Sequence, residues 1–261
     1  MEQNLSLAAT HLGRISASTA ANLLDSKTMT IAQDGPLRVT YAPFDPVARD
    51  ARVVIVGITP GRVQATNALS AARDTLEKGS SIHEALAMAK LTGSFSGPLR
   101  ANLVAMLDAI GVAKHLGVGT TAEIFQPGSQ DVHFTSALRY PVFVNDQNYN
   151  GSPDMLKTPL LRRMVETHLA EEAQMLPDAI WLPLGPKAEA ALRHLVGQGL
   201  LDQKRILGGL PHPSGANAER IAVFLGRKSP ELASRKTNPA KLLSAFKSLV
   251  TQIAAMKGAS V

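Results

Sequence analysis

The chain has 261 residues, of which 45% are hydrophobic and 18% charged, and its formal net charge is +6. These proportions are typical of a soluble globular protein with a sizeable core, and the surplus of positive charge favours polyanionic partners. The absence of cysteine excludes disulfides, thiolate metal ligands and a cysteine nucleophile. No apolar run predicts a membrane-spanning helix and the first residues do not resemble a signal peptide, so we expect a cytoplasmic protein.

The first part of the chain predicts a helix, a hairpin and a buried strand. Apolar residues recur at helical spacing in residues 5–24. Asp34 and Gly35 stand between two runs that favour extended backbone, which is typical of a hairpin turn. Residues 53–58 are almost entirely β-branched and apolar, and they predict a strand that is buried on both faces.

From residue 63 onward, predicted helices alternate with predicted strands. Ser81 and Glu84 have the spacing of a capping box at the start of one helix. Alternation of this kind favours a parallel sheet with right-handed crossovers. The other predicted helices cover residues 63–78, 99–110, 159–176 and 187–196, and the strands cover residues 132–138, 179–184 and 204–207.

The predicted fold is one α/β domain over residues 1–261, with three layers and a four-stranded, mainly parallel central sheet. Residues 1–50 form its helix-and-hairpin extension, residues 51–225 its core, and residues 226–261 a basic C-terminal helix. After Arg220 the chain has seven further lysines and arginines and a single acid, Glu231. This pattern fits either a solvated amphipathic helix or a surface that faces nucleic acid.

Two short loops carry the residues of chemical interest. Residues 57–61, Gly-Ile-Thr-Pro-Gly, follow the first buried strand, at the edge where open α/β sheets place their ligands. Residues 212–220, His-Pro-Ser-Gly-Ala-Asn-Ala-Glu-Arg, combine a histidine, a serine, an asparagine and an arginine around a Pro/Gly turn. We therefore take these two loops as the candidate site.

The two loops together resemble the signature loops of the uracil-DNA glycosylase superfamily, Gly-x-(Asp/Asn/Glu/Ala)-Pro-(Gly/Tyr/Ala) and (His/Asn)-Pro-Ser. Residues 93–97, 135–139 and 178–188 are similar, in the same order, to three further segments of the branch that carries an iron–sulfur cluster. Five ordered matches are more specific for the fold than for the substrate. Because the chain has no cysteine, it resembles a cluster-free relative of that branch and of the mismatch-specific branch.

The resemblance implies a DNA glycosylase of base excision repair that removes uracil or another deaminated or damaged base. Such an enzyme extrudes the target nucleotide from DNA into a pocket. Phe95 would stack on the base, and Ser136 with the main chain at Gly57 and Ile58 would bind its polar edge. No cofactor and no metal are implied, and we expect a monomer.

The resemblance also assigns the catalytic roles. His212 would donate a hydrogen bond to the pyrimidine O2, where negative charge grows as the glycosidic bond breaks. Thr59 would hold the attacking water. The residues implied to contact DNA are Gly61, Arg62, Ser214, Gly215, Asn217 and Arg220.

Three positions depart from the family pattern. Thr59 replaces the usual Asp, Asn or Glu, and a threonine hydroxyl can bind water but cannot act as a base near neutral pH. Ser136 replaces an asparagine and cannot make the bidentate contact that selects uracil. Ala216 stands where several relatives have a leucine that fills the space left by the extruded base.

Other functions stay open on the sequence alone. One alternative is a nucleic-acid-binding relative without catalysis, which Thr59 and Ser136 favour. Another is an enzyme that acts on a small nucleoside or nucleotide. A dinucleotide-binding enzyme is disfavoured, because residues 57–61 lack the Gly-x-Gly-x-x-Gly spacing. His212 as a surface residue, Phe95 as a core residue and Thr59 as a turn former are the purely structural alternatives.

Overall fold

The computed structural model describes residues 5–15, 23–94, 98–126 and 129–256. Its contacts divide the chain into two compact units. Unit 1 consists of residues 1–49, 58–94 and 134–177, and unit 2 of residues 50–57, 95–133 and 178–261. The units interleave along the chain, and we describe each by itself.

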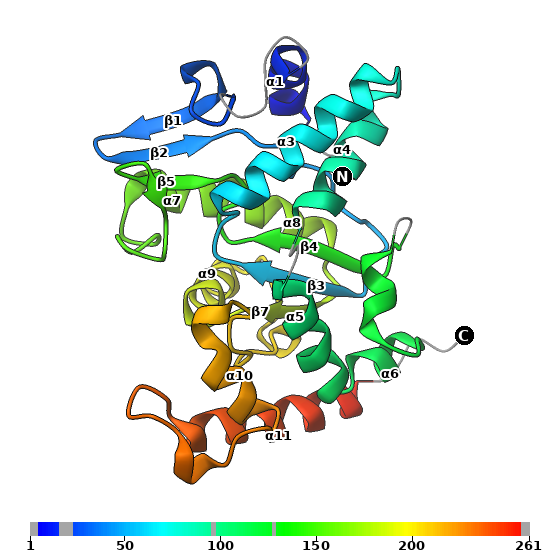
Figure 1. Cartoon of the computed structure of the whole chain (residues 1–261), viewed down its shortest axis with the longest axis vertical. Coiled ribbons are helices and arrows are strands. Elements are labelled where there is room, and N and C mark those ends of the chain that lie inside the picture. The colour runs from blue at the N-terminus through cyan, green and yellow to red at the C-terminus, as the bar shows by residue number, and fades with distance from the viewer. Residues whose placement is uncertain (1–4, 16–22, 95–97, 127–128, 257–261) are drawn as a thin grey trace. The chain divides into compact units, whose positions relative to one another are not determined.

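Unit 1 contains a four-stranded sheet in the order β1-β2-β5-β6 (Figure 1). The pairs β1–β2, β2–β5 and β5–β6 are all antiparallel. The predicted hairpin is confirmed, since Asp34 pairs with Leu37 around Gly35, whose φ of 52° suits a residue without a side chain. The strands are β1 (Thr30–Asp34), β2 (Leu37–Thr40), β5 (Val142–Val144) and β6 (Gln147–Asn148).

The helices of unit 1 include a packed pair, α3 and α4, and three consecutive segments, α7, η3 and α8. The helices α3 and α4 pack closely, because a Cβ at Gly93 would lie 3.0 Å from both the Ala68 Cβ and the Gln64 carbonyl oxygen. The capping box is confirmed: the Glu84 amide donates to the Ser81 hydroxyl at 3.2 Å, and the Ser81 amide donates to the Glu84 carboxylate at 2.8 Å. The helices are α1 (Ser6–Ile15), α3 (Arg62–Glu77), α4 (Ile82–Gly93), α7 (Pro159–Met164), η3 (Val165–Leu169) and α8 (Ala170–Met175).

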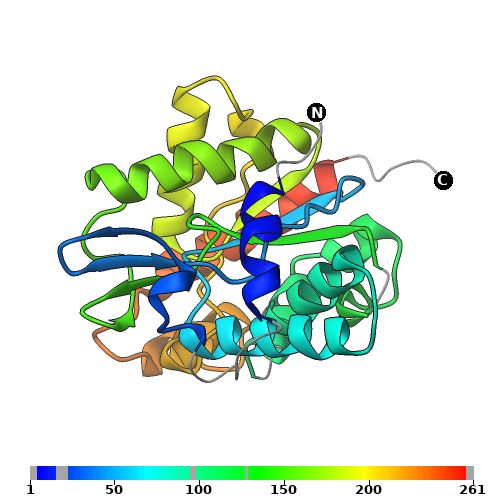
Figure 2. The ribbon, with the colours of Figure 1, turned by 90° about the horizontal axis from the view of Figure 1, so that it is seen from above.

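The predicted helix over residues 159–176 is confirmed, with one irregularity. The segments α7, η3 and α8 follow one another as a single rod, seen lengthwise in Figure 2. Its middle segment, η3, is a π-helix. Such bulges insert an extra residue into a helical turn and are frequent at functional sites.

A buried polar cluster lies in unit 1. The Arg139 guanidinium donates to Glu172 at 2.7 Å, to Glu171 at 3.1 Å and to the His168 carbonyl oxygen at 2.9 Å. The side chains of Arg139 and Glu172 are 2% and 0% exposed. Beside them, the fully buried Asp45 accepts hydrogen bonds from the Tyr41 and Tyr140 hydroxyls. Buried charged groups have no water to bind and depend on such protein partners. We therefore expect this cluster to determine much of the stability of unit 1.

Unit 2 is built on two parallel strands, β3 (Val53–Gly57) and β7 (Ile180–Pro183), in register from Val53 with Ile180. Every residue of both strands is buried. The start of β4 (Val132–Ser136) belongs to the same unit, and the sheet order is β4-β3-β7. The helices around these strands are α5 (Pro98–Ala109), α6 (Val112–Leu116), α9 (Pro186–Gly197), α10 (Ala218–Phe224) and α11 (Pro239–Ala255).

The fold is thus a mixed α/β structure, but its sheet differs from the predicted one. Among the described residues the parallel sheet has three strands, and the strand predicted at residues 204–207 is replaced by the short turn η4 (Gln203–Arg205) and isolated parallel bridges. These bridges join Ile206 to Trp181 and Leu210 to Leu184. Residues 206–210 therefore run parallel to β7, as predicted, but they form only two isolated bridges with it. Gly208 and Gly209 lie between these bridges, and glycine weakens a regular strand.

The predicted basic C-terminal helix is also shorter than expected. Residues 226–238 form a loop with one 3-10 turn, η6 (Pro230–Leu232), and α11 begins only at Pro239. Of the predicted helix over residues 5–24, Ser6–Ile15 is helical, and residues 16–22 lie outside the described part of the chain. No helix in the described ranges has the length and hydropathy required to cross a bilayer.

The buried cluster yields a stability prediction. Replacing Glu172 by Gln leaves Arg139 short of one buried counter-charge, so we expect the free energy of unfolding to fall by about 3 kcal/mol in urea denaturation. The matched control is Glu166→Gln on the same rod, whose exposed ion pair with Arg162 spans 3.8 Å and should contribute less than about 1 kcal/mol. Equal losses in the two variants would contradict this account.

Candidate functional site

The loop after β3 is attached to the segment after β4, and Thr59 makes the attachment. The Thr59 hydroxyl donates to the Tyr140 carbonyl oxygen at 3.0 Å and accepts from the Val142 amide at 3.2 Å. Next to it, the Leu138 amide donates to the Ile58 carbonyl oxygen at 3.0 Å. The hydroxyl hydrogen is therefore already used inside unit 1, which leaves Thr59 one lone pair and no donor for a water molecule.

The first amides of α3 are occupied as well. The Gly61 amide donates to the Gln64 side chain at 3.0 Å, and the Arg62 amide donates to the Asn148 side chain at 2.9 Å. Helix amino termini bind anions through such free amides. Here the side chains of Gln64 and Asn148 accept from these amides in place of an anion, so the Gly61 amide is not free for a phosphate.

The Arg62 side chain, predicted to contact DNA, lies in an internal network of unit 1. Its guanidinium donates to both carboxylate oxygens of Asp25 at 2.8 Å and to the Asp146 carbonyl oxygen at 3.1 Å. It also lies 4.7 Å from the centre of the Phe143 ring. The bonds from Arg62 hold the pKa of Asp25 below its ordinary value, so this carboxylate is ionised and paired with Arg62 near neutral pH.

The remaining residues of the predicted base-binding group are divided between the units. Gly57 is the buried last residue of β3 in unit 2. Ser136 is the half-buried last residue of β4 and belongs to unit 1 together with Ile58 and Thr59. Phe95 lies outside the described residues. The structure thus brings the strand ends that carry Ile58 and Ser136 into one unit through the Leu138–Ile58 hydrogen bond.

His212 belongs to unit 2, and its ring is held in one orientation. The Ser214 amide donates to the His212 Nδ1 at 3.3 Å. A nitrogen that accepts from an amide carries no proton, so the proton of a neutral ring resides on Nε2. Burial lowers the pKa of His212 and favours this neutral form. The ring is therefore set to donate a hydrogen bond through Nε2.

The chain on either side of His212 is anchored to helices of unit 2. The Asn102 side chain on α5 donates to the Pro213 carbonyl oxygen at 2.9 Å. Gly209 has a φ of 111°, and a Cβ at this position would lie 2.7 Å from the Ala245 Cβ on α11. The sequence did not single out Asn102, because α5 also carries Arg100 and Asp108 and an asparagine among them gives no distinct signal.

The serine, asparagine and arginine after His212 are joined by a short chain of hydrogen bonds. The Asn217 amide group donates to the Ser214 hydroxyl at 3.1 Å, and Arg220 donates to the Asn217 side-chain oxygen at 2.7 Å. Gly215 and Ala216 between them are exposed. The predicted DNA-contact residues of this loop thus form one connected structure, with Arg220 at its exposed end.

A separate cavity of about 290 Å³ lies in unit 1 between α1 and the rod of α7, η3 and α8. Its wall includes Tyr140, His168 and Glu171, and it contains none of the predicted site residues. Burial, assisted by Arg139, lowers the pKa of His168 to about 4, so its ring is neutral near pH 7. Among the described residues no group of three or more histidines and carboxylates could hold a metal ion.

The position of Thr59 gives a prediction that does not depend on any activity. Thr59→Val keeps the shape of the side chain but leaves the Val142 amide and the Tyr140 carbonyl oxygen without their partner. We expect a loss of about 1–3 kcal/mol in the free energy of unfolding, because buried groups lose a hydrogen bond. Thr59→Ser retains the hydroxyl and should lose less, and a Val variant as stable as the Ser variant would contradict the structural role.

Comparison with known proteins places the chain beside one curated relative. It is 34% identical over 216 residues to the uncharacterized protein YoxB of Bacillus subtilis strain 168, and the match covers 82% of this chain and 84% of that protein. No family model and no solved structure matches the chain. An identity of this level over most of both chains shows common descent, so the chain belongs to the same protein family as YoxB.

Proposed function

We propose that the chain is a DNA glycosylase that hydrolyses the N-glycosidic bond of uracil or another deaminated or damaged base. The observation that carries the proposal is the state of His212: it is neutral, it accepts at Nδ1 and it presents a donor at Nε2. The proposal includes the finer fold assignment, a three-layer glycosylase-like domain, and a cytoplasmic monomer with DNA as its partner.

The chemistry assigned to His212 is stabilisation of the departing base. The bond between the sugar C1′ and the base nitrogen breaks, and its electron pair leaves with the base, where charge accumulates on O2. The Nε2–H group donates to that oxygen. A water oxygen bonds to C1′, and the water proton is released to solvent or to the base. A neutral donor suits this role because it keeps its proton while the charge develops.

Thr59 has a smaller part in this proposal than the resemblance implied. Its hydroxyl hydrogen is directed to the Tyr140 carbonyl oxygen, so Thr59 shapes the loop and accepts at most one hydrogen bond from a water. Ser136 offers a single hydroxyl in place of an amide. We therefore propose relaxed selectivity among pyrimidine and purine lesions, with Arg220 and the residue 214–217 loop in contact with the DNA backbone.

The same observation on Thr59 favours a second candidate, a nucleic-acid-binding relative without catalysis. The loop that holds water in active relatives is here closed by two internal hydrogen bonds. In that case the His212 loop would bind a base without bond cleavage. The two candidates differ in one measurable property, turnover of a modified strand.

The test of the first candidate is single-turnover cleavage of oligonucleotides that contain uracil, hypoxanthine or xanthine, in single and double strands. His212→Ala should lower the rate constant about 100- to 1,000-fold, as expected for removal of one donor to a developing anion. The control is His83→Ala, an exposed histidine on α4. A His212→Ala variant as fast as an active wild type would reject the mechanism, and a wild type that binds every strand but cleaves none would favour the second candidate.

The rate should also depend on pH in a defined direction. Burial lowers the pKa of His212 below its ordinary value of 6.5, so the ring is neutral near pH 7 and becomes protonated only at a more acidic pH than an exposed histidine. Protonation of Nδ1 then removes the acceptor for the Ser214 amide. We expect a level single-turnover rate between about pH 7 and 8 and a fall at acidic pH, with its midpoint below the ordinary histidine pKa of 6.5. A rate that rises as the pH falls through 6 would contradict this assignment.

A further inference from the structure

A single carboxylate, Glu219, organises the loop between α10 and α11. Its Oε1 accepts from the Lys228 ammonium at 2.6 Å and from the Ser234 amide at 3.1 Å. Its Oε2 accepts from the Ser234 hydroxyl at 2.5 Å and from the Thr237 hydroxyl at 2.6 Å. These bonds hold the pKa of Glu219 far below its ordinary value, so the carboxylate is ionised at every pH of interest.

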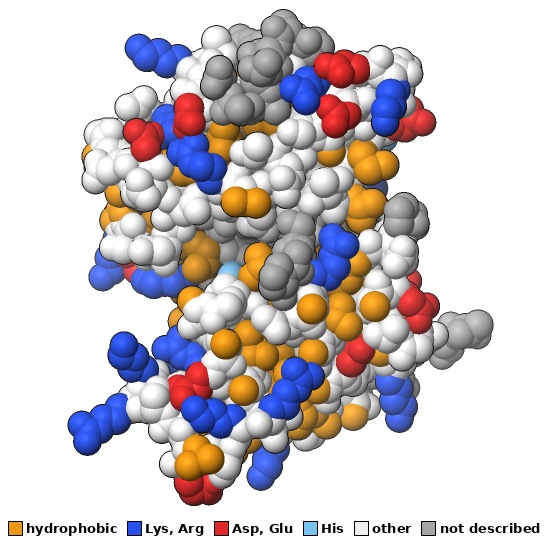
Figure 3. All heavy atoms as spheres, in the orientation of Figure 1, with side chains coloured by type: hydrophobic (Ala, Val, Ile, Leu, Met, Phe, Trp, Pro, Cys, Tyr) orange, Lys and Arg blue, Asp and Glu red, His pale blue; other side chains and the backbone are white. Residues whose placement is uncertain are grey.

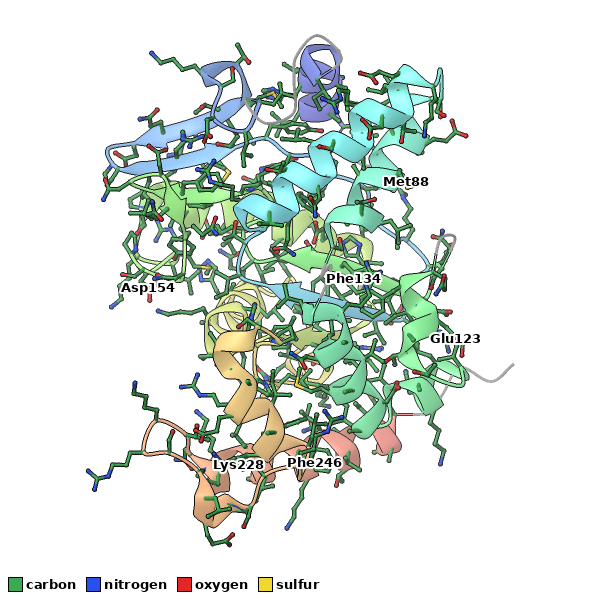
Figure 4. All side chains as sticks on the ribbon, viewed as in Figure 1. Met88, Glu123, Phe134, Asp154, Lys228 and Phe246 are labelled. Carbon is green, nitrogen blue, oxygen red and sulfur yellow. The ribbon has the colours of Figure 1, made fainter. Side chains whose placement is uncertain are left out.

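We call residues 226–238 the clamp loop, because Glu219 fastens them at three points along their length. The loop has its own local order as well: the Leu232 amide donates to the Ser229 carbonyl oxygen, and Asn238 caps α11 through the Lys241 amide at 3.0 Å. Figure 4 labels Lys228 at the start of the loop and Phe246 on α11, whose ring packs 5.2 Å from that of Phe224 on α10. The loop is thus a defined structure on two packed helices.

The clamp loop presents cations that its own acids do not neutralise. Glu219 is used by Lys228, and Glu231 accepts from the Ser229 hydroxyl. Blue side chains project from this part of the surface in Figure 3. The exposed cations of the loop and its borders are Arg220, Arg227, Arg235, Lys236 and Lys241.

An apolar side chain stands among these cations. Leu232 in η6 is 72% exposed, more than most large apolar side chains of the described chain. Proteins that bind nucleic acid combine cations for phosphates with apolar side chains that contact bases or sugars. Cations around a projecting leucine therefore fit a polyanion with apolar faces better than they fit an acidic protein surface.

The clamp loop is also connected to the candidate site. Arg220 donates to the Lys236 carbonyl oxygen at 3.2 Å, and its other nitrogen donates to Asn217 of the His212 loop at 2.7 Å. Both contacts lie within unit 2. A ligand held by the clamp loop is thereby held in a set relation to the loop that carries His212.

We propose that the clamp loop docks the backbone of DNA, with Arg227, Arg235 and Lys236 on phosphates, Leu232 on a base or sugar, and Glu219 as the positioning residue. The proposal rests on the proposed function in that DNA is the partner, but it makes no use of base cleavage. Its distinctive consequence concerns Glu219, because the removal of a negative charge should here weaken the binding of an anion.

The first test uses a fluorescein-labelled, undamaged 20-base-pair duplex and fluorescence anisotropy over a range of KCl concentrations. Arg235→Ala/Lys236→Ala should reduce the slope of log affinity against log salt by about 2, since each phosphate contact contributes about 0.9. The control removes the same charge elsewhere, from the exposed Lys78 and Lys157 of unit 1. A slope change equal in the two double variants would overturn the proposal in favour of a diffuse charge effect.

The second test separates positioning from charge. Glu219→Gln raises the net charge by one, so simple attraction predicts tighter binding, whereas loss of the clamp predicts binding at least threefold weaker and faster tryptic cleavage after Arg235 or Lys236. Leu232→Ala should weaken binding with an unchanged salt slope. Tighter binding by Glu219→Gln would overturn the proposal.

The outcomes for the clamp loop and for catalysis are distinguishable. Salt-dependent binding that is sensitive to the clamp, without cleavage of any lesion, would support the clamp loop and reject the glycosylase. Cleavage of a lesion, together with DNA binding that is unchanged in Arg235→Ala/Lys236→Ala, would support the glycosylase and overturn the clamp-loop proposal. Absence of measurable binding to the duplex at 50 mM KCl would overturn the assignment of DNA to this surface.

Discussion

The structure depends first on the pairing of two strands that have no exposed residue. Every side chain of β3 and β7 is buried, so neither strand can satisfy its backbone with water, and each must bond to a neighbour. Their parallel register directs both carboxyl ends to the same edge. The parallel bridge between Leu184 and Leu210 extends this edge, within unit 2, to the segment that contains His212.

Ionised groups are used differently in the two units. In unit 1 the charges of Arg139 and Glu172 lie in the interior, where their value depends on the completeness of their partners. In unit 2 the carboxylate of Glu219 lies at the surface and gathers an ammonium, two hydroxyls and an amide. The first arrangement constrains the core, whereas the second gives shape to a loop that has almost no apolar surface to bury.

The two candidate loops, described each in its own unit, differ in whether their polar groups are available to a ligand. The neutral ring of His212 has an accepting Nδ1 and therefore a donor at Nε2. Thr59, Gly61 and Arg62 are engaged with partners inside unit 1. The resemblance to uracil-DNA glycosylases therefore fits the loop that carries His212 better than it fits the first loop.

The sequence by itself determined the elements whose signals are local. These are the apolar strands at residues 53–57 and 180–183, the Asp34-Gly35 hairpin and the Ser81–Glu84 capping box, each of which depends on residues a few positions apart. Only the tertiary structure decided that β5 joins β2 from a hundred residues away, that Thr59 bonds to Tyr140, and that residues 226–238 form a loop under Glu219 rather than the start of a helix. The physical reason is that a hydroxyl or a carboxylate has several equivalent partners along a chain, and only the folded backbone selects which of them lies within hydrogen-bonding distance.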